Sequence, residues 1–257
     1  MQYLSHSQID MFQQCQYRWY LTYRAKAPQA PSDALTLGTA FHAAVEIAGN
    51  AKRDNESLSL QQLYEIAEQS LQNVCERDTT QFLRAHLNEM QTTVHKMLFA
   101  YYHDILPRLT TATIEEKFTM SLTPQLYFTG RIDAVTARGT IVDFKTGKPW
   151  STGAEHTKDQ ATAYLMIKTE TKRVVFIVFP IVNNICIPQI LPTERTPQQI
   201  ATYRKHVIDT AQRMQTQTCT PHTGPLCAYC GVLGSCTVGQ LWLKQQNKHA
   251  AVPIIHV

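Results

Sequence analysis

The sequence lacks any run of apolar residues that approaches the roughly 18 needed to cross a membrane as a helix. Residues 1–20 also lack the continuous apolar core of a secretory signal peptide. Internal repeats and low-complexity tracts are absent, and the formal net charge of +4 neither proves nor opposes a polyanionic partner. We therefore expect a soluble, cytoplasmic protein without a membrane partner, whose 257 residues, 44% hydrophobic, can bury one substantial core.

Cysteine is present in an odd number, seven residues. Without a secretory leader, an odd number argues against a disulfide framework and for a reducing cytosolic setting. Cys227, Cys230 and Cys236 have the spacing C-x2-C-x5-C, which indicates ligation of a metal or a metal cluster. Cys75 and Cys186 lie in apolar segments, and we expect them to be packing residues. Three thiolates leave a fourth ligand to be found.

Two short apolar runs, residues 127–135 and 140–144, each present a carboxylate. The first contains Asp133 in Gly-Arg-Ile-Asp, and the second presents Asp143 and then Lys145 in Asp-Phe-Lys-Thr-Gly. Because successive side chains of a strand point to opposite faces, Asp143 and Lys145 should project together. If the two runs pair as a hairpin, the two aspartates lie near each other.

Two close carboxylates repel each other unless a cation holds them, and hard oxygen ligands suit Mg²⁺ or Mn²⁺. Lys145 can then orient or deprotonate an attacking water and offset the negative charge that grows on a phosphate. The pattern therefore predicts a metal-dependent phosphodiester hydrolase. The alternative interpretation is a surface hairpin with unrelated charges, which suits one aspartate alone better than the whole pattern.

The order of these motifs resembles that of RecB-type nucleases of the PD-(D/E)xK superfamily. Two further segments add to the resemblance. The segment Gly38-Thr39-Ala40-Phe41-His42 resembles the start of a family helix whose histidine supplies an additional metal ligand, and Gln160 to Tyr164 resembles the Gln-x-x-x-Tyr helix that follows the lysine. One helical turn separates Gln160 from Tyr164, so both side chains can face one cleft.

The resemblance implies the following metal ligands: His42, Asp133, Asp143 and the carbonyl oxygen of Phe144. The implied catalytic residues are Lys145, Asp133, Asp143, Gln160, Tyr164 and one glutamate of the first predicted strand. Glu115 and Glu116 are both candidates for that glutamate, but neighbours on a strand cannot both point inward. We expect Glu116, because Phe118 resembles the aromatic residue that accompanies the glutamate of the family.

A subset of these nucleases, which includes the nuclease domain of AddB and CRISPR-associated RecB-like exonucleases, binds a [4Fe-4S] cluster. One cysteine precedes the nuclease core and three follow it. Residues 4–21 resemble the N-terminal signature of this subset, although Gln16 stands where the family usually has proline. The resemblance therefore implies a structural cluster that joins the two ends of the chain, ligated by Cys15, Cys227, Cys230 and Cys236.

Zinc is the alternative to iron, because four sulfur ligands in a tetrahedron suit either metal. In that case His222 or Cys219 could replace Cys15 in a local zinc knuckle.

The predicted fold class is α/β, with one nuclease domain over residues 1–257. The resemblance implies a restriction-endonuclease-like mixed central sheet flanked by helices, with a helical insertion at about residues 55–107. The cluster-binding region comprises residue 15 and residues 219–240. The predicted strands cover residues 113–122, 125–135, 140–144, 173–179 and 185–191. The predicted helices cover residues 5–23, 38–48, the segment with Gln160 and Tyr164, and residues 197–215.

From these residues we expect metal-assisted hydrolysis of nucleic-acid phosphodiester bonds. The resemblance implies an exonuclease that acts on single-stranded DNA or on free ends. It also implies a setting in DNA repair, recombination, phage replication or CRISPR adaptation, with a helicase, a recombination protein or an adaptation complex as partner. The alternative is a non-catalytic DNA-end-binding or scaffold protein of such a complex. Degenerate members usually lose an acid or the lysine, so the complete set of motifs favours an enzyme.

Overall fold

The computed structural model describes residues 1–78 and 81–250. The chain divides into two compact units. The first contains Met1–Tyr3 and Pro31–His206, and the second contains Leu4–Ala30 and the described residues 207–250. The second unit is therefore assembled from two segments that are far apart in the sequence. The single nuclease domain stays a prediction.

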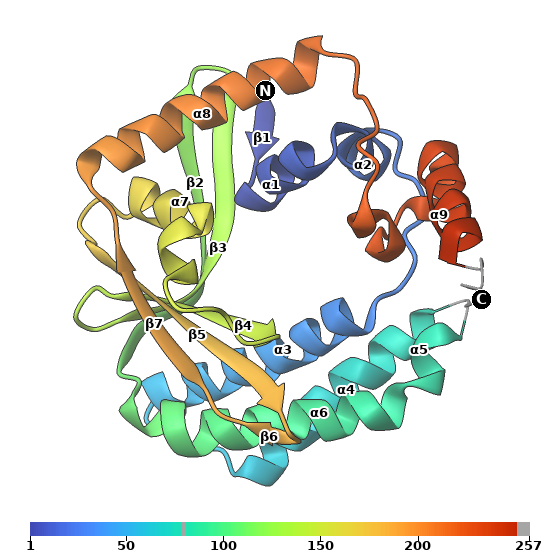
Figure 1. Cartoon of the computed structure of the whole chain (residues 1–257). Helices are drawn as coiled ribbons and strands as arrows, with labels where there is room; N and C mark the ends of the chain where they lie inside the picture. Colours follow the sequence, from blue (N-terminus) through green and yellow to red (C-terminus); the bar gives the residue numbers. More distant parts are fainter. Residues whose placement is uncertain (79–80, 251–257) are drawn as a thin grey trace, which may run out of the picture. The chain divides into compact units, whose positions relative to one another are not determined.

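Seven strands of the described residues form one mixed sheet (Figure 1). The strands are β1 (Gln2–Leu4), β2 (Thr111–Thr123), β3 (Leu126–Thr136), β4 (Ile141–Gly147), β5 (Arg173–Val182), β6 (Ile185–Cys186) and β7 (Gln189–Glu194). The order is β1-β3-β4-β5-β6, with β2 also paired to β3 and β7 also paired to β5. Strands β4 and β5 are parallel, and the β2–β3, β3–β4, β5–β6 and β5–β7 pairs are antiparallel. The prediction of a mixed central sheet is confirmed.

Strands β3 and β4 form the predicted hairpin. The backbone N–H of Thr136 donates to the carbonyl oxygen of Thr140 at 2.9 Å, and the N–H of Gly139 donates to the carbonyl oxygen of Thr136 at 2.9 Å. Gly139 has a φ of 77°, a left-handed conformation that glycine adopts without steric cost. This tight turn fixes the register that brings the two apolar runs together.

Three long helices of the first unit lie together on one face of the sheet (Figure 1). They are α3 (Asp33–Arg53), α4 (Leu60–Arg77) and α6 (Leu87–Ala100), with the short α5 (Phe82–Ala85) before α6, and with a π-helical turn (Tyr101–Ile105) and a 3-10 turn (Leu106–Arg108) after it. Ser59 and Gln62 form a capping box that starts α4. The aromatic rings of Phe41, Tyr101 and Phe179 pack against one another in the core beneath these helices. The expected helical insertion therefore forms one wall of the core.

Helix α7 (Asp159–Ile167) follows a 3-10 turn (Ala154–Thr157) and connects β4 to β5. A parallel pair of strands needs such a crossover. Buried residues of α7, among them Ala161 and Tyr164, pack with Ile141 and Phe176 of the sheet. The predicted helix that carries Gln160 and Tyr164 is thereby confirmed.

The second unit contains the N-terminal helices and the C-terminal part of the chain. Its elements are α1 (His6–Gln14), α2 (Gln16–Trp19), a π-helical turn (Tyr20–Arg24), the end of α8 (Pro197–Thr216), two 3-10 turns (Pro225–Tyr229 and Leu233–Ser235) and α9 (Thr237–Ala250). Within it, the N–H of Tyr17 donates to the carbonyl oxygen of Thr220 at 3.2 Å, and that of Ala30 to the carbonyl oxygen of Gly231 at 2.7 Å. The two chain ends are thus joined by backbone hydrogen bonds.

The predicted single helix over residues 5–23 is interrupted. Ser5 caps α1, as expected, but Cys15 is extended, with φ −161° and ψ 110°, and its sulfur accepts the N–H of Arg18 as the cap of α2. The predicted strand 185–191 is likewise divided, because β6 and β7 are separated by Ile187 and Pro188, and proline has no N–H to donate. In the described parts of the chain, no helix has the length and apolarity to cross a membrane.

Candidate active site

Three carboxylates lie side by side on three adjacent strands. The β2–β3 register pairs Ile114 with Ala134 and Glu116 with Ile132, so Glu115 of β2 and Asp133 of β3 lie at the same level between these pairs. The β3–β4 register pairs Ala134 with Val142, so that the next residues along these strands, Asp133 and Asp143, are neighbours. Like charges directly opposite each other on a sheet are destabilising. A row of three acids is therefore an arrangement that calls for a cation.

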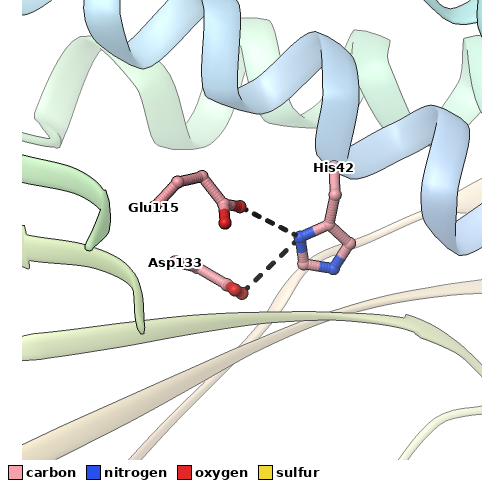
Figure 2. A group of neighbouring side chains, drawn as sticks. All are labelled: His42, Glu115 and Asp133. Atoms are coloured by element: carbon pink, nitrogen blue, oxygen red, sulfur yellow. Dashed lines mark ion pairs between the residues drawn. The ribbon is translucent and has the colours of Figure 1, made fainter. Parts of the chain in front are cut away.

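His42 of α3 completes a compact group of ligand atoms with two of these acids (Figure 2). Its Nδ1 lies 3.7 Å from Oδ2 of Asp133 and 4.0 Å from Oε1 of Glu115. The three ligand atoms lie within 4.8 Å of one another, and the described residues contain no second group of three histidine, cysteine or acidic side chains as compact. One imidazole nitrogen and two carboxylate oxygens form a donor set that suits Mn²⁺, and the carboxylates also suit Mg²⁺.

Asp143 is the centre of a second set of contacts. Its carboxylate is almost fully buried, with 1% of the side chain exposed. The Lys145 ammonium lies 2.7 Å from Oδ2, the Tyr164 hydroxyl donates to Oδ1 at 2.6 Å, and the amide nitrogen of Gln160 donates to the Tyr164 hydroxyl oxygen at 2.8 Å. Asp133 is tied to the same strand, because its Oδ2 accepts the backbone N–H of Phe144 at 2.7 Å. The residues predicted from the motifs therefore converge in one neighbourhood.

Burial and mutual repulsion dominate the electrostatics of this neighbourhood. Burial, and then the charge of Asp143, raise the pKa of Asp133 well above its usual value. Burial raises the pKa of Glu115 to about 7, against the opposing effect of the Arg131 guanidinium. Burial lowers the pKa of His42, which keeps the imidazole neutral and able to bind a metal. In the absence of a cation these acids favour protons, and a bound cation would replace them.

Two buried carboxylate oxygens also lack a well-oriented hydrogen bond: Oε2 of Glu115 and Oδ2 of Asp143. Each has only a cationic side chain beside it, from Arg131 and Lys145 respectively. Buried polar atoms without hydrogen-bond partners are rare in proteins. Each oxygen keeps a lone pair beyond its ion pair, and both belong to the row of acids beside His42, so the residues present fit a divalent cation.

The glutamate that faces this site is Glu115, and the expectation of Glu116 is corrected. Glu116 accepts a hydrogen bond from the Thr113 hydroxyl at 2.8 Å and is ion-paired with Lys168, outside the row of acids. Glu115 has a φ of 50°, which places it in the left-handed region and breaks the regular alternation of β2. Alternation and the likeness of Phe118 to a family aromatic could not reveal this local kink. The Arg131–Glu115 ion pair was also missed.

Phe144 lies between Asp143 and Lys145 in β4, and its side chain packs against Tyr101 and Phe179. This matches the predicted alternation of β4, with apolar side chains on one face and the acid and lysine on the other. The role of its carbonyl oxygen as a metal ligand stays a prediction.

The four cysteines singled out in the sequence line one cavity of about 120 Å³ in the second unit. The sulfur of Cys15 accepts the backbone N–H of His222 at 3.3 Å, and that of Cys236 accepts the N–H of Gly239 at 3.4 Å. A side chain on Gly239 would come within 3.3 Å of the Cys236 sulfur and 3.8 Å of the Cys227 sulfur, so glycine keeps the cavity open. All seven cysteines are free thiols. Cys75 is buried in the core, in agreement with a packing role.

A neutral imidazole, a row of acids and a lysine on adjacent strands of a mixed sheet define a cation site suited to phosphodiester hydrolysis. A family model described as the PD-(D/E)XK nuclease superfamily matches residues 3–237. The chain belongs to this superfamily of metal-dependent nucleases.

Comparison with solved structures agrees with the fold. A protein from Eubacterium rectale, described as a candidate exonuclease, has 13% identity and a TM-score of 0.52, covering 83% of this chain and 80% of its own. That likeness supports the restriction-endonuclease-like fold alone. The protein SSO0001 has 13% identity and covers 67% of this chain and 80% of its own. Its TM-score of 0.38 is too low to carry an argument. A comparison with curated proteins gave no match.

Proposed function

We propose that this protein is a divalent-metal-dependent deoxyribonuclease of the RecB type, an exonuclease that acts on single-stranded DNA or on free ends. The observation that carries the proposal is the convergence of His42, Glu115 and Asp133 beside the Asp143–Lys145 pair. The superfamily supports a nuclease. Exonuclease action and the setting in repair, recombination or CRISPR adaptation rest on the motif resemblance, and the cytoplasmic location rests on the odd number of cysteines.

His42, Glu115 and Asp133 would hold Mg²⁺ or Mn²⁺, with Asp143 and the carbonyl oxygen of Phe144 as further ligands. When bound, the ion would supply a water of lowered pKa and positive charge for the scissile phosphate. Glu115 thereby takes the place that the sequence assigned to Glu116. The neutral state of His42, favoured by burial, leaves its nitrogen lone pair available as a ligand.

Lys145 would supply the positively charged donor beside the reacting phosphate. Its side chain is 30% exposed, so the ammonium can reach a substrate while the ion pair with Asp143 orients it. Tyr164 and Gln160 act as positioning residues, because the Tyr164 hydroxyl fixes the Asp143 carboxylate and Gln160 fixes that hydroxyl. This chain of hydrogen bonds holds acid and lysine in one geometry before a substrate binds.

The activity test compares wild type with Lys145→Ala on labelled single-stranded DNA in the presence of Mn²⁺. We expect the substitution to lower the rate by about 10²–10³-fold, the usual effect of removing one donor to a developing charge. Lys117→Ala is the matched control, because Lys117 is an exposed lysine of strand β2 in the same sheet and its removal should leave the rate unchanged. If wild type and Lys145→Ala bind DNA equally and neither degrades it, the enzyme proposal is wrong and a scaffold or end-binding protein takes its place. Products from 5′- and 3′-labelled strands test the exonuclease assignment.

We also propose that Cys15, Cys227, Cys230 and Cys236 hold a structural [4Fe-4S] cluster. The four thiols line one cavity, and backbone N–H groups already donate to two of the sulfurs, as is common around iron–sulfur clusters. A single zinc ion would need sulfurs about 3.8 Å apart, given Zn–S distances of about 2.3 Å. In the described residues the cysteines form no ligand group that compact. The choice of a cluster over zinc rests on the resemblance of residues 4–21 and of the cysteine spacing to the cluster-binding subset of these nucleases.

Metal analysis of anaerobically purified protein tests this proposal. We expect a brown protein with about four iron atoms per chain, and loss of the iron in Cys236→Ser. Cys75→Ser is the control, because Cys75 is buried in the core of the first unit and should leave the iron content unchanged. A colourless protein with one zinc per chain would instead establish the zinc alternative. The family match spans parts of both units, which supports the proposal of one nuclease domain.

A further inference from the structure

A hollow of about 610 Å³ in the first unit is lined by three arginines and no acid. The arginines are Arg108, Arg138 and Arg173, and the remaining lining residues are three threonines and three apolar residues. Three like charges around one hollow repel one another, and a cleft lined by charge of one sign attracts ions of the opposite sign. None of the residues assigned to the metal site or to the cysteine cavity lines this hollow.

The three arginines come from three separate segments that are held together. Arg108 ends the 3-10 turn before β2, Arg138 lies in the β3–β4 turn, and Arg173 begins β5. The N–H of Ala137 donates to the carbonyl oxygen of Thr110 at 2.9 Å, which ties the turn to the start of β2. The Lys52 ammonium donates to the carbonyl oxygen of Pro107 at 3.0 Å and holds the segment that carries Arg108. These hydrogen bonds therefore hold in place the segments that carry Arg108 and Arg138.

The guanidinium groups are free to bind an anion. Among the side chains of residues 1–78 and 81–246, no ion pair involves Arg108, Arg138 or Arg173. Glu194 lies opposite Arg173 across the β5–β7 pair, but it does not line the hollow and it forms no ion pair with Arg173. Arginine presents a planar fork of donors that matches a phosphate group.

Threonine hydroxyls supply further donors in the same hollow. Thr110, Thr136 and Thr140 line it together with the arginines. Oγ1 of Thr136 accepts the backbone N–H of Thr140 at 3.0 Å, so its hydroxyl hydrogen remains available to an acceptor. Arginine and threonine donors without any carboxylate are the set that contacts the phosphates of a nucleic-acid backbone.

We propose that this hollow is a second anchoring site, which binds a backbone phosphate of the nucleic-acid strand away from the metal site. The identity of the ligand rests on the proposed nuclease function. Val142 lines the hollow, whereas the next residue, Asp143, points to the opposite face of β4 toward Tyr164. The partner of Asp143 on β5 is Phe176. Arg173 lies three residues before Phe176, which is a separation of roughly 10 Å along the strand. The two sites therefore cannot hold the same phosphate.

Long and short substrates separate this anchoring site from the catalytic site. The test compares wild type, R138Q/R173Q and the control R77Q/R84Q, which removes two exposed arginines elsewhere in the first unit. Binding of a long fluorescent single-stranded oligonucleotide is titrated over a range of salt concentrations in EDTA, which prevents cleavage. Turnover of a dinucleotide with Mn²⁺ is measured in parallel, and R138K/R173K tests whether the positive charge is sufficient.

We expect R138Q/R173Q to bind the long oligonucleotide at least about tenfold more weakly. The slope of log K against log salt should become shallower by about 0.7 for each phosphate that the variant no longer neutralises. Dinucleotide turnover and the thermal midpoint should stay at the wild-type values, and R138K/R173K should keep the wild-type slope. The proposal is overturned if R138Q/R173Q keeps the wild-type affinity and slope, or if R77Q/R84Q weakens binding as much. Failure of wild type to hydrolyse either substrate would instead refute the proposed function, while the binding comparison would still decide the anchoring site.

Discussion

At the scale of single residues, one backbone torsion decides which of two adjacent glutamates belongs to the site. A φ of 50° is uncommon for a residue other than glycine and costs on the order of 1–3 kcal/mol. Such a conformation persists only where its surroundings impose it. Here the Arg131 ion pair and the position opposite Asp133 hold Glu115, while Lys168 holds Glu116 on the other side. Strain of this kind concentrates at functional sites.

Substitution of each glutamate separates their roles. We expect Glu115→Gln to weaken Mn²⁺ binding and lower nuclease activity by about 10–100-fold, because a charged oxygen ligand is removed. Glu116→Gln should leave both within about threefold of wild type, because it removes only a partly exposed ion pair worth about 0–1 kcal/mol. Calorimetric titration with Mn²⁺ and initial rates on DNA measure the two effects. Equal losses in the two variants would contradict the assignment of Glu115.

The pKa shifts of Glu115 and Glu116 predict opposite dependences of stability on pH in metal-free protein. Folding raises the pKa of Glu115 from 4.5 to about 7, so the folded state binds more protons than the unfolded state between these values. The contribution of Glu115 therefore falls as pH rises from 4.5 to 7. Lys168 lowers the pKa of Glu116, so the contribution of Glu116 is lost instead as pH falls through its lowered value.

Thermal midpoints in EDTA check this prediction. From pH 4.5 to 7, the thermal midpoint of wild type should fall relative to that of Glu115→Gln. It should not fall relative to that of Glu116→Gln. The lowered pKa of His42 contributes with the opposite sign near pH 6.5, and because it arises mainly from burial, this contribution is largely common to the three proteins. An unchanged difference for Glu115→Gln across this range would speak against a buried, protonated Glu115.

At the scale of elements, the sequence predicted what short-range patterns determine. The β3–β4 hairpin follows from two apolar runs joined at Gly139, whereas α7 was expected from the resemblance of residues 160–164 to a family helix. The break of the first helix at Cys15 and the kink at Glu115 were not predictable, because each depends on partners distant in sequence. Cys15 faces the segment around His222, and Glu115 faces Asp133 through a register that only the folded sheet defines.

The β2–β3 pair yields a prediction about Gly130. A Cβ at Gly130 would overlap with the ring of Phe118, its partner on β2. We expect Gly130→Ala to lower the free energy of unfolding by about 1–3 kcal/mol, the usual cost of overpacking. The double variant Gly130→Ala, Phe118→Leu should recover most of this loss. Gly234→Ala is the control, because a Cβ there meets open space. Urea unfolding measures all four proteins, and an unaffected Gly130→Ala would show that the ring moves aside freely.

At the scale of the whole molecule, the second unit has to be closed from the two ends of the chain. Its hydrogen bonds join Tyr17 to Thr220 and Ala30 to Gly231, across about two hundred residues of intervening sequence. The entropy cost of closing such a loop is high, and a few backbone hydrogen bonds offset little of it. Ligation of Cys15 together with the distal cysteines would remove much of this cost from the folding of the second unit.

Loss of the proposed cluster should therefore destabilise the second unit selectively. In iron-free protein or in Cys236→Ser, we expect limited proteolysis to cut first within residues 4–30 and 207–250, while the first unit stays protected because its core contains none of the four cysteines. Thermal unfolding should separate into two transitions, of which only the earlier one shifts with iron content. Mn²⁺ should still raise the midpoint of the later transition, because His42, Glu115 and Asp133 all belong to the first unit. A single transition at the same temperature with and without iron would refute a stabilising role for the four thiolates, whatever metal they bind.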